Sequence, residues 1–410
     1  MNQPFLNKDQ PVFAAFLKLV TGLLIIGLFF SKALQSISII VLAIGWIFLK
    51  PTKNQLSALF KNRLFLTTTI IAFIYLFSAI ISSNKSDAFA AVKDKILFLF
   101  VPVSFYLLTF SNVEKIAYKF TFGICAMVQA MYATTFYVQN IKQTAIIYSI
   151  GNVLPVIKIH HVQIAVLIAI TVLLLLSVVF DTIKKQVQYV AVFIAVVLFF
   201  FLHLFAVRSG LILVYLFLIL YFSLQWIQLK KWNYLFVFCI FLVGCLYTVT
   251  QVSATIKQKI GYMKYDYEQY KNKAADAFQY SDSRRLQSIK YGIEIWKENK
   301  LLGCGVGDIK DECAVLYKQQ NPTIEERFMY LPHNQYVYFL TGFGLVLGAI
   351  LMLCFIFPVL YFFRNGENLY CVIYAGLVVF ALWDSFLGTL FGTCIYLLII
   401  GFGIQKSKQY

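Results

Sequence analysis

Long apolar runs dominate the chain and limit what it can fold into. A helix needs about 20 apolar residues to cross the ~30 Å hydrocarbon core of a bilayer. Only 13% of the residues are charged, so polar groups cannot cover the surface of a water-soluble fold of this size. We therefore predict an all-α polytopic membrane protein of about twelve transmembrane helices. The expected spans are residues 13–30, 33–49, 64–82, 96–110, 116–139, 162–180, 187–207, 211–228, 233–251, 335–363, 369–386 and 387–404.

The positions of Lys and Arg predict how these spans are oriented. With both termini in the cytoplasm, the short cytoplasmic segments carry fourteen Lys and Arg, and the short outer loops carry seven. An excess of this kind is typical of the cytoplasmic side of membrane proteins. The basic residues punctuate apolar runs rather than gathering on one soluble surface, so the net charge of +17 does not indicate a nucleic-acid partner.

One long polar segment divides the spans unequally. About nine spans lie in residues 1–251, a loop on the outer face occupies residues 252–333, and three more spans lie in residues 334–410. We predict that all three parts form one membrane domain. A transporter usually has two related halves with a site at mid-membrane. The lopsided order and the few charges within the spans disfavour a polysaccharide or lipid transporter, which is the alternative from another functional class.

The middle of the loop predicts an amphipathic helix over residues 284–300. Ser281–Ser283 offer N-caps, and Gly303 offers a stop. Arg284 and Arg285 lie in the first turn, where a solvated helix face is the simplest role for either one alone. The apolar side chains that recur at helical spacing are Leu286, Ile289, Ile293 and Trp296.

A glycine-rich turn follows this helix. Gly303, Gly305 and Gly307 alternate with other residues, which permits tight turns and close backbone approach. No Gly-Lys-Ser/Thr follows, so a structural turn is favoured over a phosphate-binding loop. Cys304 and Cys313 can pair if the loop faces an oxidising compartment. No Cys/His pair has zinc-site spacing, and we expect no metal or other cofactor.

Polar residues also mark the outer ends of several spans. Pro332, His333 and Asn334 begin the tenth span, where the helix dipole favours a neutral imidazole that can accept a proton near pH 7. An interfacial His that caps the span is the alternative. Arg208 ends the seventh span, where arginines often extend to the interface. Three more polar residues are expected on this face, with ordinary interfacial roles as the alternative: His160, His161 and Asp384.

The order of these motifs resembles the O-antigen ligase and O-antigen polymerase family. The resemblance covers about 110 residues, roughly 281–392, and the N-terminal half matches only in span number and loop placement. The chain departs from the family at residues 300–302, where a proline is common. The motifs that carry the resemblance are Arg285-Leu286, Trp296, Leu302 to Gly307, Pro332 to Tyr336, Gly342-Phe343-Gly344, the run 382–387 and Gly392.

This resemblance implies a metal-independent glycosyltransferase of the bacterial inner membrane with its active site on the periplasmic face. The donor would be a glycan on undecaprenyl diphosphate. An O-antigen ligase moves that glycan to lipid A–core in lipopolysaccharide biosynthesis, and we predict this type. A polymerase of the same family moves it to a second lipid-linked glycan and is the alternative.

The resemblance also implies roles for individual residues. The essential loop His of the family corresponds to His333, which would accept the proton of the acceptor hydroxyl. The arginines that contact the donor diphosphate correspond to Arg208 and Arg285, with Arg284 as the alternative by one position. Four further residues are candidates for acceptor contacts or support of the site: His160, His161, Asp384 and Asn334.

Overall fold

The computed structural model describes residues 10–141, 143, 153–228, 254–272 and 280–406, with scattered positions between 230 and 247. The described residues form helices and contain no strand, which confirms the predicted all-α polytopic fold. Eight of the described helices are long and apolar enough to cross a membrane. They are α1 (Gln10–Phe30), α2 (Lys32–Leu49), α4 (Arg63–Ile81), α7 (Asn112–Gln139), α9 (His161–Asp181), α10 (Lys185–Phe205), α11 (Arg208–Gln228) and α16 (Gln335–Arg364).

Shorter helices complete the membrane part. The expected ninth span, 233–251, lies mostly outside the described residues. Within the bundle, the expected span 96–110 forms only an 11-residue helix that contains Pro102. The shorter helices are α3 (Lys53–Phe60), α5 (Lys85–Lys95), α6 (Leu97–Leu107), α17 (Asn368–Phe380) and α18 (Leu390–Lys406).

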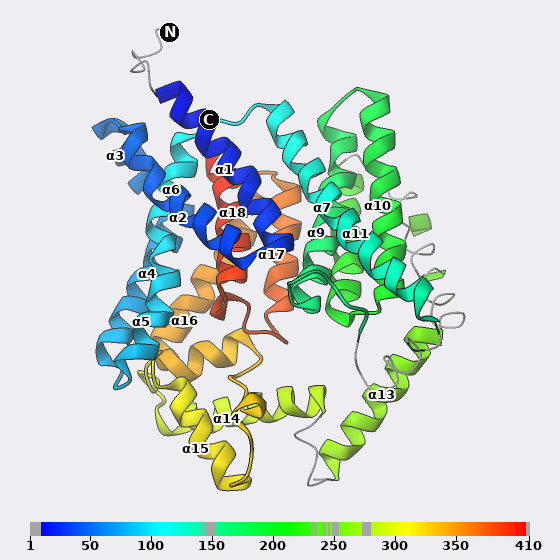
Figure 1. Ribbon diagram of the computed structural model, residues 1–410. Helices are drawn as coiled ribbons and strands as arrows, with labels where there is room; N and C mark the ends of the chain where they lie inside the picture. The colour runs from blue at the N-terminus through cyan, green and yellow to red at the C-terminus, as the bar shows by residue number, and fades with distance from the viewer. Residues whose placement is uncertain are drawn as a thin grey trace.

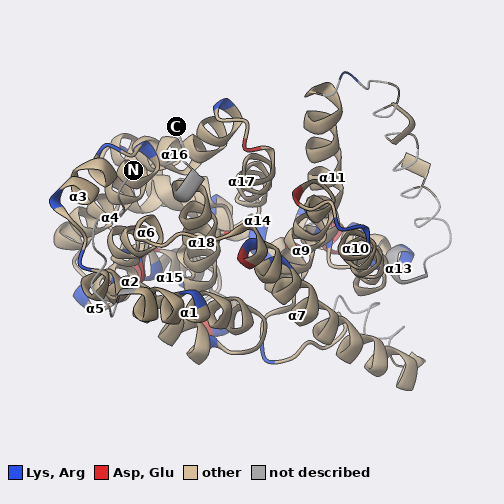
Figure 2. Ribbon diagram, turned by 90° about the horizontal axis from the view of Figure 1, so that it is seen from above, with Lys and Arg blue, Asp and Glu red and all other residues tan. Residues whose placement is uncertain are grey.

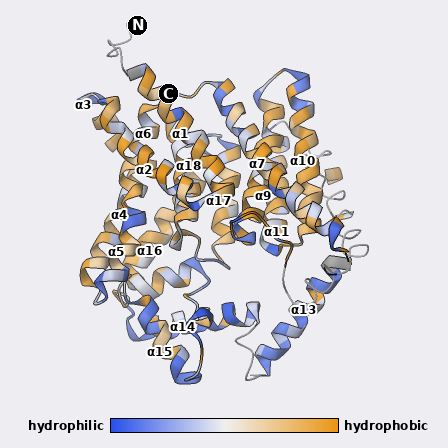
Figure 3. Ribbon diagram, viewed as in Figure 1, coloured by the Kyte–Doolittle hydropathy of each residue, from blue (hydrophilic) through white to orange (hydrophobic). Residues whose placement is uncertain are grey.

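The long loop is largely helical and lies on one face of the bundle. The start of α1 and the end of α18 lie at the opposite face (Figure 1). The loop helices are hydrophilic whereas the bundle is hydrophobic (Figure 3), and charged residues gather at helix ends and on the loop (Figure 2). The loop elements are α13 (Ala254–Lys271), α14 (Ser281–Glu298), α15 (Ile309–Gln320) and the short η2 (Glu326–Phe328).

The last two spans differ from the prediction. The helix α17 ends at Phe380, so the expected span 369–386 is too long. Residues 381–389, which we call the hairpin segment, form turns and the short η3 (Phe386–Gly388) before α18 begins. Gln335 holds this segment, because its N–H donates to the Ala381 carbonyl at 2.8 Å and its side-chain oxygen accepts from Leu387 N at 2.7 Å.

The tenth expected span, α16, is broken in its N-terminal part. Gly344 has φ +68° within α16, a conformation that L side chains rarely adopt. The loop packs against α16 at this break, where Leu345 N donates to the Lys300 carbonyl at 2.8 Å. A Cβ on Gly344 would lie 2.3 Å from the carbonyl carbon of Leu301. The loop and the N-terminal part of α16 therefore pack as one unit.

Candidate active site

The helix α14 is capped by a residue from another loop helix. It begins at Ser281, and Tyr280 at the N-cap makes no side-chain capping bond. Instead, the carboxylate of Asp266 in α13 accepts from Asp282 N at 2.8 Å and from Ser283 N at 3.0 Å. Asp266 is fully buried. A carboxylate at this position satisfies the free N–H groups of the first turn and complements the helix dipole. The predicted self-capping by Ser281–Ser283 is therefore wrong, because α13 supplies the cap.

This cap leaves the Asp282 side chain available for Arg208. Arg208 begins α11, and its two terminal nitrogens donate to the two Asp282 oxygens at 2.7 and 2.6 Å. Lys259 of α13 lies in the same environment, and its pKa falls to about 8 because burial and the Arg208 charge outweigh the influence of Asp282. Arg208 thus joins the loop to the bundle.

The predicted apolar stripe is not the face on which α14 packs most closely. Leu286 stays 39% exposed, while the buried positions are Ser283, Ser288, Tyr291, Gly292 and Ile295. Gly292 explains this, since a Cβ there would lie 2.7 Å from Pro332 Cγ. The hydroxyl of Thr341 in α16 donates to the Gly292 carbonyl at 2.9 Å. Small residues let α14 approach α16, and periodicity alone does not reveal such a contact.

The neighbouring arginines of α14 have different surroundings. Arg284 lies over the Tyr330 ring at 4.7 Å and over the Phe328 ring at 5.5 Å, and its Nε donates to the Tyr280 carbonyl at 3.4 Å. Arg285 is half-buried, and its side chain has no hydrogen-bond or ion-pair partner within the described part of the chain. Its guanidinium is therefore available for a ligand.

His333 lies beside these arginines. Its backbone N–H donates to Ser288 Oγ at 3.1 Å, and its ring centroid lies 5.0 Å from that of Tyr330. Nδ1 is buried and has no partner among the described residues. Burial, followed by the charges of Arg285, Arg284 and His160, lowers the pKa of His333 to about 4. The imidazole is thus neutral at pH 7, and burial rather than the helix dipole is the main cause.

Asn334 supports the fold around the site. Its side-chain oxygen caps α16 by accepting from Tyr336 N at 2.9 Å and Val337 N at 3.0 Å. Its amide nitrogen donates to the Leu382 carbonyl at 2.8 Å. Both ends of the side chain are therefore engaged, and Asn334 fixes the hairpin segment against α16.

Three other predicted residues lie close enough to Arg285 for its charge to affect them. Burial raises the pKa of Asp384, in the hairpin segment, to about 6, and Arg285 opposes this rise. Partial desolvation, followed by the charges of Arg285 and Lys32, lowers the pKa of His160. The His160 and His161 rings lie 4.3 Å apart at the start of α9. The structure thus places α9, α14 and the hairpin segment near Arg285, and Lys32 of α2 near His160.

The glycine turn, which we define as residues 303–308, is a structural connection. Gly303 has φ +73° and Gly305 has φ +99°. Cys304 N and Gly305 N donate to the carbonyls of Thr341 and Gly342. Both oxygens of Asp308 accept backbone N–H groups at the start of α5, from Ser83 at 2.8 Å and from Asn84 at 2.6 Å. The favoured structural role is confirmed, and Cys304 and Cys313 are free thiols rather than a disulfide.

The matched family agrees with this arrangement. Residues 190–353 match the family model described as O-antigen ligase. The match makes this region of the chain similar to O-antigen ligases. No curated protein sequence matches the chain. The matched region begins in α10, includes Arg208, the loop and His333, and ends in α16, so it spans most of the candidate site.

Several residues of the site were not predicted from the sequence. The sequence marks Asp282 only as part of a possible N-cap. No motif distinguishes Asp266, Lys259 or Lys32 from other charged residues in loops and at helix ends. Tyr330, which stacks on Arg284, precedes His333 by three residues, so its position in the chain was the only available indication.

Proposed function

We propose that the protein transfers a glycan from undecaprenyl diphosphate to a sugar hydroxyl of lipid A–core, at the periplasmic face of the bacterial inner membrane. The family match supports a glycosyltransferase of the O-antigen ligase or polymerase type. The observation that carries the proposal is Arg285, a half-buried cation without a partner in the described chain, beside a neutral His333.

The two groups divide the chemistry between them. The acceptor oxygen attacks the anomeric carbon, the bond from that carbon to the diphosphate oxygen breaks, and undecaprenyl diphosphate leaves with the bonding electrons. His333 takes the hydroxyl proton as the new bond forms and later returns it to water. Arg285 stabilises the charge on the leaving diphosphate through planar N–H donors that suit phosphate oxygens. Attack opposite the leaving group inverts the anomeric centre.

Arg208 has a second role in this proposal. Its contact with Asp282 uses one N–H on each terminal nitrogen, so other N–H donors of the guanidinium remain. In the proposal, the diphosphate that Arg285 binds also accepts from these donors, and the ion pair is kept. Asp282 then acts as a positioning residue that keeps Arg208 at the edge of the loop. Arg284, which is stacked on Tyr330, is assigned to the support of this surface.

The arginines supply the charge stabilisation, so the proposed reaction needs no divalent cation. The membrane lipid delivers the donor, and both termini lie on the cytoplasmic side in the proposed orientation. The purified protein should retain full transfer activity in EDTA. Strict dependence on added Mg²⁺ would contradict the role given to Arg285.

The deciding experiment offers the purified protein one lipid-linked oligosaccharide donor and two acceptors in separate reactions. One acceptor is lipid A–core, and the other is a second lipid-linked repeat unit. Transfer to lipid A–core supports the ligase proposal. Transfer only to the second repeat unit would make the protein a polymerase, and no transfer to either would remove the proposed function.

A further inference from the structure

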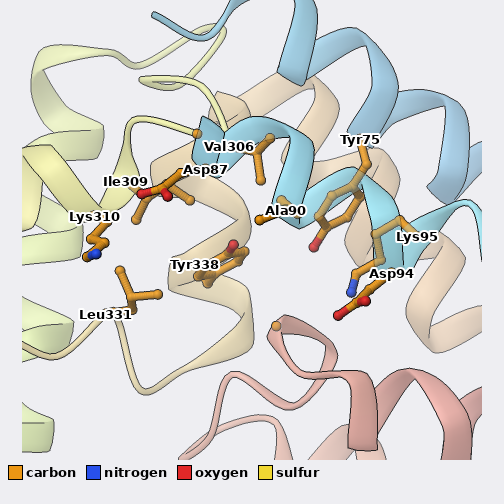
Figure 4. Close-up of a pocket in the computed structure, with 13 residues that line it drawn as sticks. Tyr75, Asp87, Ala90, Asp94, Lys95, Val306, Ile309, Lys310, Leu331 and Tyr338 are labelled. Carbon is orange, nitrogen blue, oxygen red and sulfur yellow. The ribbon is translucent and has the colours of Figure 1, made fainter. Parts of the chain in front are cut away.

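A cavity of about 250 Å³ lies between the bundle and the loop, apart from the arginines. Its wall comes from α4, α5, the glycine turn, α15 and the first turn of α16 (Figure 4). Lys310 and Leu331 are exposed and mark its opening, whereas Tyr75 and Lys95 are buried and mark its closed end. Leu331 precedes His333 by two residues, and Gly388 of the hairpin segment also lines the cavity. The cavity therefore adjoins the proposed active site.

The closed end contains a polar group without a partner. Tyr75 is only 1% exposed, and its hydroxyl is buried without a hydrogen bond in the described chain. Figure 4 shows this hydroxyl pointing into the space between Tyr338 and Lys95. A buried hydroxyl without a partner destabilises the fold. A ligand oxygen or hydroxyl in the cavity would remove that cost.

Lys95 has further unused donors at the same place. It is 2% exposed, its ammonium donates to the Thr393 hydroxyl at 3.1 Å, and it lies 5.4 Å from the centre of the Tyr75 ring. An ammonium has more N–H donors than this one hydrogen bond uses. Asp94 lies next to Lys95 on the wall, and Asp87 lies about two turns earlier on α5. Donors and acceptors thus face the same small space.

The chemistry of the wall identifies the class of ligand. Lys95 and Lys310 balance Asp87 and Asp94, which disfavours a strongly anionic ligand such as a phosphate. Carboxylates accept from sugar hydroxyls, and the ammonium and phenol donate to sugar oxygens. The volume of about 250 Å³ lies just below the ~300–1,000 Å³ found for small-ligand pockets, which suits one sugar ring. We infer that this cavity binds an uncharged sugar ring of the acceptor glycan, an inference that rests on the proposed function.

The direct test measures sugar binding without any transfer reaction. The purified protein in detergent is mixed with methyl glycosides of glucose, galactose and N-acetylglucosamine, and saturation transfer from protein to sugar is recorded by NMR. At least one glycoside should receive saturation from the wild-type protein. Ala90→Trp, which places a large side chain on the exposed wall of the cavity, should abolish the signal. Ser86→Trp, at an exposed α5 position outside the cavity, is the matched control and should keep it.

A kinetic test separates this inference from the proposed function. Tyr75→Phe removes only the unpartnered hydroxyl, so the KM for the acceptor should rise by about two- to tenfold while the KM for the donor stays unchanged. Tyr132→Phe, at an exposed position of α7, should change neither constant. If the wild-type protein transfers glycan but Ala90→Trp and Tyr75→Phe leave acceptor KM and saturation transfer unchanged, the cavity is not the acceptor site. If sugar binding depends on the cavity but no acceptor is glycosylated, the proposed function fails instead.

Discussion

The glycine turn and the region around His333 belong to the same loop but treat their polar groups differently. In the glycine turn, Asp308 uses both carboxylate oxygens to bind the start of α5, and the backbone N–H groups of Val306 and Gly307 donate to serine hydroxyls of α4 and its C-cap. Around His333, the imidazole Nδ1 has no partner and Arg285 has no ion pair within the described chain. In the first region the polar groups stabilise the fold through hydrogen bonds, and in the second they remain available to a ligand.

This contrast divides the loop into residues that stabilise the fold, which we call the support, and residues that are available for the reaction. A buried polar group without a partner costs free energy, so a fold keeps it only where something else compensates. The conspicuous Gly-x-Gly-x-Gly pattern belongs to the support. The less conspicuous Arg285 and His333 lie where a ligand can complete the contacts. Five predictions test this division, from the largest expected effect to the smallest.

Removal of the His333 side chain should have the largest effect on activity. His333→Ala should lower kcat by about 10²–10⁴-fold, because the acceptor hydroxyl loses its proton acceptor. The fold should persist, since the contact with Ser288 uses the backbone N–H of residue 333. Steady-state transfer and binding of the lipid-linked donor are measured on the same preparation. Wild-type turnover in this variant would remove the mechanism, and loss of donor binding would indicate a structural role.

Removal of the Arg285 side chain should have the second-largest effect on activity. Arg285→Ala should lower kcat/KM for the donor by about 10–100-fold, the value of one charge-assisted hydrogen bond to the leaving group. Arg285→Lys should recover part of this loss, because it keeps the charge but not the planar fork. The thermal stability of both variants should equal that of the wild type, since Arg285 has no partner to lose in the described chain. A large fall in Tm with unchanged kcat/KM would instead assign Arg285 to the fold.

A change at the support should reverse this pattern, with lower stability and normal chemistry. Gly344→Ala forces a residue with a Cβ into φ +68° and ψ −169°, a region essentially restricted to glycine, which costs about 1–3 kcal/mol, and also directs the Cβ against Leu301. Gly366 also has a positive φ, +69°, but nothing lies within 4 Å of its Cβ position, so Gly366→Ala carries a conformational cost without any contact. Thermal unfolding in detergent should show a larger Tm loss for Gly344→Ala. Equal losses would show that the loop does not pack tightly into the break.

The pH dependence should report the charge around His333. The pKa of His333 is lowered to about 4, so its neutral, proton-accepting form prevails as pH falls from 8 and is lost only near pH 4. Arg285→Gln removes a positive charge that disfavours the imidazolium, so the acid limb of the remaining activity should move to higher pH. Asp384 also titrates, with a pKa of about 6, and Asp384→Asn is the background for this comparison. An unchanged acid limb in Arg285→Gln would show that the Arg285 charge does not affect the pKa of His333.

The membrane fold was predictable from the sequence because apolar length is a local property. The apolar run at residues 162–180 predicts a span without any knowledge of neighbours, and α9 confirms it. The end of α17 was not predictable, because Gln335, far away in the chain, holds the hairpin segment through two hydrogen bonds. The contact between Arg208 and the loop also joins distant parts of the chain, so only the family resemblance predicted that Arg208 lies near the loop. Asp282 as its partner depends on Asp266 having taken over the helix cap.

The smallest effect is expected at Arg284, the neighbour of Arg285. Its guanidinium lies over the Tyr330 ring, and such a contact contributes about 0.5–1 kcal/mol where it is partly exposed. Arg284→Gln should therefore change kcat/KM for the donor by only about two- to fivefold. Tyr330→Leu should match it, because it removes the other half of the same contact. If Arg284→Gln instead costs more than Arg285→Gln, the diphosphate contacts the stacked arginine, and the division between support and chemistry lies one residue earlier in α14.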